Sequence, residues 1–406
     1  MCPIQGMRTT ENFSPATVRP ENWREGILLL EPNGDAPLFA LSSQMKSKSV
    51  DDAKFHWFEK IMADRRFALA EDLDATETAV DIVSGGLELK IGDLLYVEKT
   101  GEIMLVNAKP ASDVLLGTVV RSYAGTSAVG TVLFATENPN LLLIGSAYEE
   151  GSEAPEGIAY DPVEKYNYCQ IFRNSLEATN TAIETHLRTG DAIREAKREA
   201  LMYHSTDVER SAWFGSRDQT TRNGKPVRTT EGFFTWLTRE NPANVKTLGA
   251  TTSLKQLEDE LKKAFRYGSN EKMGWIGDQA MLIVQRIVRK NSQGMELIQN
   301  QREFGMNVSR LITPFGTVVL KTHPMFNRIT SSAGVYTSVD SWLAVMDMSR
   351  VGYRYLRNRD TKYQTGQENN GQDGMKSGYI TECGFAFEQA ITHYLIKGFT
   401  AEAADA

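Results

Sequence analysis

The stretch DAIREAKREALMYHSTDVERSAWF, residues 191–214, decides how the rest of the chain is organised. It predicts a helix of roughly 24 residues, about 36 Å long, with Asp191 as its N-cap. The residues expected along one broad apolar side are Ile193, Ala196, Ala200, Leu201, Tyr203 and Val208. The other side carries charges of both signs, which indicates a face in contact with solvent or a neighbour and not a nucleic-acid stripe.

The composition of the 406 residues is that of a soluble globular protein, with 41% hydrophobic and 24% charged residues. Two or more structural regions are expected at this length. The net charge of −7 argues against a surface built uniformly to wrap DNA. No apolar run approaches the roughly 20 residues of a membrane span, and the N-terminus lacks a secretory signal, so neither secretion by that route nor a membrane partner is expected.

The cysteines are Cys2, Cys169 and Cys383, far apart and without a CxxC pair. They indicate neither a disulfide framework nor a zinc cluster, and they suit a reducing cytoplasm.

Two features precede the helix. Residues 1–50 carry scattered prolines and isolated apolar anchors such as Trp23 and Phe39, which predicts an extended arm packed on its own subunit or on a neighbour. Residues 51–71 hold an aromatic cluster that fits a strand or a short helix.

Residues 79–145 predict a small β barrel or sandwich, because short apolar runs alternate with Gly, Pro, Asn and Asp. The runs are AVDIV, DLLYVE, EIMLVNA, VLLGTVV, GTVLFA and NLLLIG. The clearest hairpin turn is Lys99 to Glu102, where Gly101 supplies a positive φ. An acidic linker, residues 147–162, closes this module, with a boundary near residue 155.

The remainder predicts a mixed α+β region. Residues 163–188 show no clean repeat, and GSRDQTTRNGKPVRTTEG, residues 215–232, is interpreted as a loop. Amphipathic helices are expected at 254–267 and 278–290, with strands at 274–277 and 315–326.

Two runs near the C-terminus predict a long antiparallel ribbon. Val351, Tyr353 and Tyr355 alternate with Arg350 and Arg354 in the first run. In GYITECGFAFEQAI, residues 378–391, Glu382 and Glu388 lie opposite the aromatic face, so arginines should face glutamates across the strands.

No catalytic, cofactor-binding or metal residue is predicted. The histidines His56, His186, His204, His323 and His393 are far apart, and His204 and His323 are interpreted as surface or packing residues. Asn223-Gly224-Lys225 is a poor phosphate loop, because Pro226 removes a backbone donor. Cys169 and Cys383 lack the companions of a nucleophile and are expected to be buried small hydrophobes.

Two charged clusters have competing interpretations. Glu149, Glu150, Glu153 and Glu156 favour a solvated linker over a calcium loop. The cluster Tyr353, Arg354, Tyr355, Arg357 and Arg359 mixes aromatics and cations as nucleic-acid surfaces do, but an acidic partner strand explains the charges more simply.

The order of elements resembles a tailed-phage major capsid protein of the Hong Kong 97 type. Three parts of the sequence carry the resemblance. EAKREALMYHSTDVERSAWFG is similar to the spine helix, and the A-domain order of helix, strand and strand is followed by GWIGDQAMLIVQRIVR, FGTVVLKTHPMF and VYTSVDSWLAVMDMSR. The paired P-domain strands are resembled by VGYRYLRNRD and GYITECGFAFEQAITHYLIKGF. The chain departs from the simplest members at residues 72–150, where a barrel-like insertion enlarges the E-loop.

The resemblance implies an α+β capsid fold with six segments. These are an N-terminal arm (1–50), an E-loop region with the β-rich insertion (51–155), a P-domain part with the spine helix (156–224), an A-domain (225–349), a P-domain β ribbon (350–390) and a final A-domain strand with the tail (391–406). Only about 50 residues precede the E-loop region, which implies little or no fused scaffolding segment.

The function implied is a non-enzymatic shell protein without cofactors, found in the virion and assembled in the host cytoplasm. Its copies would form hexamers and pentamers of an icosahedral head around double-stranded DNA, which they would contact non-specifically. A portal protein is a further partner, and scaffolding or decoration proteins are optional ones. The alternatives are an encapsulin-like compartment, a soluble enzyme with an accessory barrel, and a DNA-binding phage protein that uses the arginine-rich ribbon.

Overall fold

The protein divides into two compact units in the computed structural model. The described residues are 45–74, 77–108, 115–126, 140–155, 157–185, 192–249, 251–290, 296–303, 306–326 and 338–399. We call Phe58–Val163 the excursion and the described residues on either side of it the body. Most of the predicted arm, the N-cap Asp191, Cys2, His186, Glu156 and the run 130–135 lie outside the described residues.

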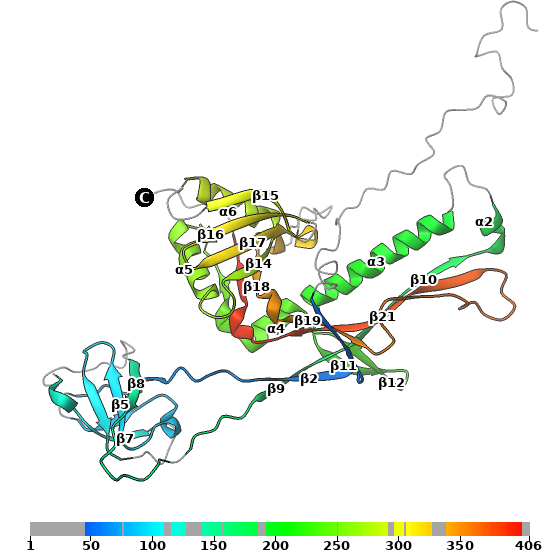
Figure 1. Ribbon diagram of the computed structural model, residues 1–406. Coiled ribbons are helices and arrows are strands. Elements are labelled where there is room, and N and C mark those ends of the chain that lie inside the picture. Colours follow the sequence, from blue (N-terminus) through cyan, green and yellow to red (C-terminus); the bar gives the residue numbers. More distant parts are fainter. Residues whose placement is uncertain are drawn as a thin grey trace, which may run out of the picture. The chain divides into compact units, whose positions relative to one another are not determined.

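The excursion is a small barrel (Figure 1). Its strands are β3 (Arg66–Ala68), β4 (Ala79–Asp81), β5 (Asp93–Val97), β6 (Ile103–Val106), β7 (Leu115–Val120) and β8 (Asn140–Ser146). They pair in the order β3-β8-β5-β6-β7-β4, and a bridge between Leu69 and Ile82 joins the two outer strands. The sheet therefore closes on itself, as the barrel prediction requires.

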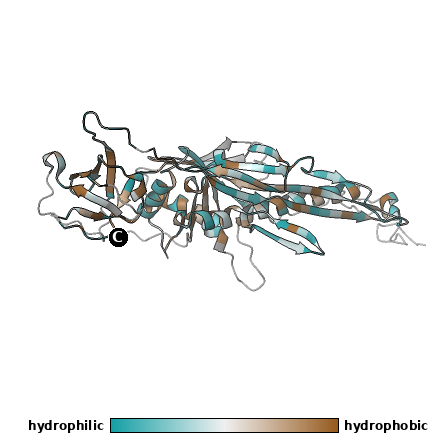
Figure 2. Cartoon of the chain, turned by 90° about the horizontal axis from the view of Figure 1, so that it is seen from below, coloured by the Kyte–Doolittle hydropathy of each residue, from teal (hydrophilic) through white to brown (hydrophobic). Residues whose placement is uncertain are grey.

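Apolar side chains fill the barrel, and its strands are largely brown in the hydropathy view (Figure 2). Ile82, Leu89, Leu95 and Met104 are fully buried. The predicted turn joins β5 to β6, where Gly101 has a φ of +76° and its N–H donates to Val97 O at 2.9 Å. The sequence prediction of this hairpin is confirmed.

The body contains a long twisted sheet beneath the predicted helix. The helix is α3 (Ala192–Phe214), which lies along β10 and β21 (Figure 1). The strands run β1-β19-β21-β10, with β20 also paired to β21. Their bounds are β1 (Lys46–Val50), β10 (Gln170–Ala178), β19 (Val351–Leu356), β20 (Lys362–Gln364) and β21 (Met375–Phe387).

The predicted ribbon is confirmed by the antiparallel pairing of β19 with β21, where Tyr353 lies opposite Phe385. Arg354 pairs with Glu388 at 3.5 Å and Arg359 with Glu382 at 2.5 Å, so arginines do meet glutamates. The sheet extends further than predicted, because β10 pairs along most of β21.

A second, seven-stranded sheet forms the rest of the body's core, in the order β13-β22-β18-β14-β17-β16-β15. Its strands are β13 (Val245–Thr247), β14 (Glu271–Ile276), β15 (Glu296–Glu303), β16 (Met306–Thr313), β17 (Gly316–Thr322), β18 (Leu343–Met346) and β22 (Tyr394–Lys397). The helices α5 (Leu254–Ala264) and α6 (Asp278–Lys290) pack against it, close to their predicted ranges. Ser253 starts α5 with a capping box to Gln256.

Both faces of this sheet are buried, which explains its continuous apolar runs. Val318 and Leu320 of β17 join the cluster under α5 and α6, whereas Val319 joins the cluster on the other face. Leu343 and Ala344 of β18 divide in the same way.

Three expectations need correction, and one helix was not anticipated. Residues 215–232 are not simply a loop, because they contain the hairpin β11 (Asp218–Arg222) and β12 (Lys225–Thr229). Residues 163–188 contain β9 (Val163–Tyr168), β10 and the short helix α2 (Asn180–Glu184), and β9 pairs with β2 (Lys54–Glu59). The aromatic run after the hairpin forms a further helix, α4 (Phe233–Glu240).

The last correction concerns the buried face of α3. Leu201 and Tyr203 were expected on the apolar side but are 38% and 66% exposed. Val208, which was also expected there, is buried in the C-terminal half of the helix, together with Ala212 one turn later. Polar His204 lies on the same side, one turn before Val208, and this is why the pattern was misleading.

Candidate assembly surfaces

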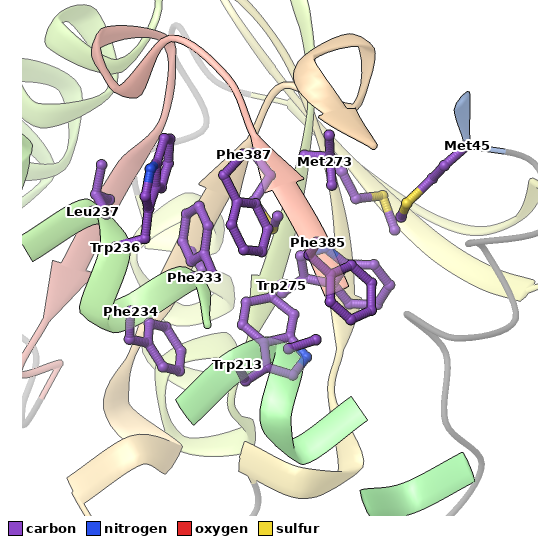
Figure 3. Packing of buried hydrophobic residues seen from close by; sticks show 14 of the residues in the cluster. Met45, Trp213, Phe233, Phe234, Trp236, Leu237, Met273, Trp275, Phe385 and Phe387 are labelled. Carbon is purple, nitrogen blue, oxygen red and sulfur yellow. The ribbon is translucent and has the colours of Figure 1, made fainter. Parts of the chain in front are cut away.

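The end of α3 is anchored in an aromatic cluster (Figure 3). The ring centroid of Trp213 lies 5.3 Å from that of Phe234, 6.0 Å from Trp275 and 4.9 Å from Phe326. The pairs with Trp275 and Phe326 are edge-to-face, whereas the Phe234 ring is tilted by 36°, and aromatic pairs stabilise beyond their buried area, each by about 1 kcal/mol. The cluster joins α3, α4 and the seven-stranded sheet into one core.

Two glycines permit the sharp connection between β12, α4 and the end of α3. A Cβ on Gly215 would come within 2.5 Å of Ser211 O, and one on Gly232 within 2.6 Å of Gly215 N. The Gly232 N–H donates to Gly215 O at 2.9 Å. The two chain segments therefore meet backbone to backbone, at the base of the β11–β12 hairpin.

Buried histidines link the elements of this core. His323 Nδ1 accepts from the Met325 N–H at 3.1 Å, and its Nε2 lies 3.1 Å from Trp213 Nε1 and 2.5 Å from Glu209 Oε1. His204 Nε2 lies 2.7 Å from Thr381 Oγ1, and burial lowers the pKa of this histidine. Both act as packing residues between α3 and its neighbours.

Lys272 has a property that catalytic lysines share, because burial lowers the pKa of its amine to about 8. Its three donors are all used, however, because Nζ donates to the carbonyl oxygens of Ala264, Tyr267 and Thr392 at 2.6–2.7 Å. The lysine therefore braces three segments. Among the described residues no group of three His, Cys, Asp or Glu side chains is arranged to hold a metal ion.

The charged clusters singled out from the sequence have different environments. Tyr353 is buried and donates to Asp360 at 2.9 Å, and Arg357 pairs with Asp51 at 3.1 Å. The arginines of the ribbon therefore have acidic partners within the protein, which favours the partner-strand interpretation over a surface on which nucleic-acid bases stack. Glu149, Glu150 and Glu153 are exposed on the excursion.

Large apolar side chains are exposed where the chain passes between body and excursion through β2 and β9. Phe58 is 70% exposed, Met62 94% and Val163 57%, with Ile61 beside them. Several such side chains within one short region mark an interaction surface, whereas single exposed ones do not.

The two units also differ in charge. Residues 58–163 contain 18 Asp and Glu against 7 Lys and Arg, a net charge of −11. The whole chain has −7, so the remaining residues carry +4. The charge of this protein is thus segregated along its sequence.

Comparison with known proteins decides the family. Residues 4–400 match the family described as SU10 major capsid protein. The chain belongs to the SU10 major capsid protein family. It is 29% identical over 383 residues to a major capsid protein of Pseudomonas phage PaMx41, covering 89% of this chain and 84% of that protein.

Two solved structures show weak similarity to the chain. A holo-SrpI encapsulin from Synechococcus elongatus PCC 7942 has a TM-score of 0.43 at 10% identity, covering 61% of this chain and 81% of its own. A Microbacterium phage Oxtober96 chain has a TM-score of 0.42 at 10% identity, covering 94% and 96%. These scores are low, and the assignment rests on the SU10 family match.

The family confirms the predicted resemblance: the chain is a phage major capsid protein with a structural role in the virion. The predicted α+β class is confirmed, and the described residues contain the predicted long helix, antiparallel ribbon and small barrel. The hairpin β11–β12 is one of the elements that the sequence interpretation missed. Its signal was present, since Asn223-Gly224 between two polar five-residue runs is typical of a two-residue hairpin turn.

No helix in the described residues has the length and apolar character that crossing a bilayer demands.

Proposed function

We propose that copies of this capsid protein assemble into hexamers and pentamers, which close into an icosahedral head around double-stranded DNA. The observation that carries the proposal is the SU10 family match over residues 4–400. The exposed Phe58, Met62 and Val163 support it, because contacts with other copies would remove these apolar groups from water.

Stability should then depend on assembly. A partner that binds only the folded subunit stabilises it by mass action, so the assembled protein should melt at a higher temperature than the free subunit. We propose that the subunit in the shell is divided into the six segments expected from the sequence, from the arm at 1–50 to the final strand and tail at 391–406.

We also propose that assembly takes place in the host cytoplasm with a portal protein, and with scaffolding or decoration proteins encoded separately. The packaged DNA would be touched non-specifically. The net charge of −7 supports this weak, general contact over a dedicated DNA-binding surface.

Electron microscopy of the purified protein tests the proposal. Closed particles tens of nanometres wide, with hexameric and pentameric units in class averages, are expected. A discrete dimer or tetramer at all concentrations would contradict it, and particles that enclose protein and never nucleic acid during infection would point to a compartment instead.

A further inference from the structure

The hairpin β11–β12 (Asp218–Thr229) is a two-stranded sheet that no other described strand pairs with. Every residue of β11 is exposed, as are Lys225, Pro226 and Val227 of β12. Isolated two-stranded hairpins are marginally stable in water. The hairpin has its base at the Gly215–Gly232 connection and its tip at Asn223-Gly224, where both residues have positive φ.

The tip concentrates positive charge. Arg222 and Lys225 lie directly opposite each other across the strands, and like charges in this position repel. Neither side chain has an ion pair or hydrogen bond with another described residue. Such a pair of adjacent cations is stabilised when anionic groups of a partner bind between them.

The excursion offers a surface of opposite charge. Glu149, Glu150 and Glu153 lie in an exposed turn, in which the Ser152 N–H donates to Glu149 O at 3.2 Å. Their carboxylates make no ion pair with other residues that the structure describes. Glu149 and Ser152 of this turn line a hollow of about 750 Å³, together with Tyr148 and Pro155 from the linker and Lys90, Ile91 and Tyr123 from the barrel.

We propose that the Arg222–Lys225 tip of one copy binds the acidic turn, Glu149–Glu153, beside the hollow on a second copy. A protruding basic tip fits a hollow beside an acidic turn in both shape and charge. Every copy carries both surfaces, so the contact is heterologous and repeats around a ring. This inference rests on the proposed self-assembly and names one of its contacts.

Carboxylates of a second copy fit the tip better than DNA does. Two tip cations would neutralise few phosphates, and the net charge of −11 on each excursion repels a polyanion. The same −11 attracts the basic tip. The planar fork of Arg222 also matches a carboxylate in a bidentate geometry.

Charge reversal tests the contact. Full-length Arg222→Glu/Lys225→Glu and Glu149→Lys/Glu150→Lys should each lose most particles in electron microscopy and sedimentation. Mixing the two variants should restore even-membered rings, in which the two chains alternate, but not five-membered ones, and one chain carrying all four substitutions should regain assembly alone. Lys255→Glu/Lys262→Glu, on the exposed side of α5, makes the same change in charge as the reversed tip and is its control.

Cysteine trapping gives a second, direct readout. A mixture of full-length Lys225→Cys and Glu150→Cys chains, made distinguishable by mass, should form a mixed disulfide-linked dimer under mild oxidation, whereas either variant alone should not. The same pair placed at Lys255 and Glu150 is the control.

The outcomes separate the two proposals. If the unmodified protein makes no particles, the proposed function fails. If it makes particles and the reversed tip assembles equally well, or the four-fold variant is no better than either double variant, only this contact is wrong. Reversed-tip particles that form normally but lose salt-sensitive DNA binding would overturn it in favour of DNA.

Discussion

At the scale of single residues, buried charges brace the turns of the barrel. Arg121 Nε donates to Glu102 Oε1 at 2.6 Å and its Nη2 to Oε2 at 2.9 Å, and both side chains are buried. Arg121 also donates to Asp74 O at 2.7 Å. One ion pair thus holds the β5–β6 turn against the loop that precedes β4.

Replacing Glu102 with Ala should therefore destabilise the excursion by about 3–5 kcal/mol, because Arg121 would remain buried without its counter-charge. Hydrogen exchange of the full-length protein should show faster exchange in β5–β7 and unchanged exchange in α6. Glu98→Ala is the matched control, since the Arg66–Glu98 pair is exposed and should contribute under about 1 kcal/mol. Equal effects of the two substitutions would refute the role of burial.

A second residue, His393, makes stability depend on pH. Burial lowers its pKa from 6.5 to about 4, and its neighbours Lys272 and Arg350 also lower it, while Asp347 and the Glu388 carbonyl oppose the shift. The unfolded chain binds the extra proton between these two values, so stability is full above pH 6.5 and falls as the pH drops towards 4.

His393→Gln should reduce this loss by about 2.5 kcal/mol between pH 7 and pH 4.5. Gln keeps an acceptor for the Asp347 N–H and a donor for the Glu388 carbonyl, but it does not titrate. Urea unfolding followed by tryptophan fluorescence at both pH values measures the difference.

At the scale of elements, the joint between α3 and α4 depends on Gly232. Its replacement by Ala places a methyl group within 2.8 Å of the Gly215 N, Trp213 C and Ser211 O atoms, so the backbone must shift. We expect a loss of about 1–3 kcal/mol in unfolding free energy. Gly249→Ala, which meets nothing within 4 Å, should change stability by well under that amount in the same urea titration. An unchanged midpoint for Gly232→Ala would show that the joint is looser than described.

The elements with strong local patterns were predictable from the sequence. α6 follows a clear helical period, and Gly101 marks the β5–β6 turn. β10 was not recognised, because its pairing with β21 is a long-range contact that leaves many of its side chains exposed. α4 has only eight residues, too few for a helix that is stable by itself, so its helical form depends on tertiary packing.

The assembly surfaces were less predictable than the fold. Single exposed apolar residues such as Met62 have no distinctive pattern, and their meaning comes from the proximity of Phe58 and Val163 to the same crossing. Charge segregation, by contrast, can be counted directly once the limits of the excursion are known.

At the scale of the whole molecule, the exposed side chains at this crossing should matter for assembly and not for folding. Phe58→Ser/Met62→Ser should change the unfolding free energy of the free subunit by no more than about 0.5 kcal/mol, since neither side chain is buried there. The yield of particles should fall severalfold in sedimentation. Leu282→Ser, on the exposed side of α6, is the control, and an undiminished yield for the double variant would exclude a contact at the crossing.

The pairing of β2 with β9 has a further consequence for the chain's architecture (Figure 1). The excursion leaves and re-enters the body through these two neighbouring strands, whose backbones lie about 4.8 Å apart wherever they are paired. Any foreign domain whose own termini are close together satisfies the same geometric condition. One inserted domain can therefore be exchanged for another at this position, by evolution or by engineering, while α3 and both sheets of the body keep their sequence.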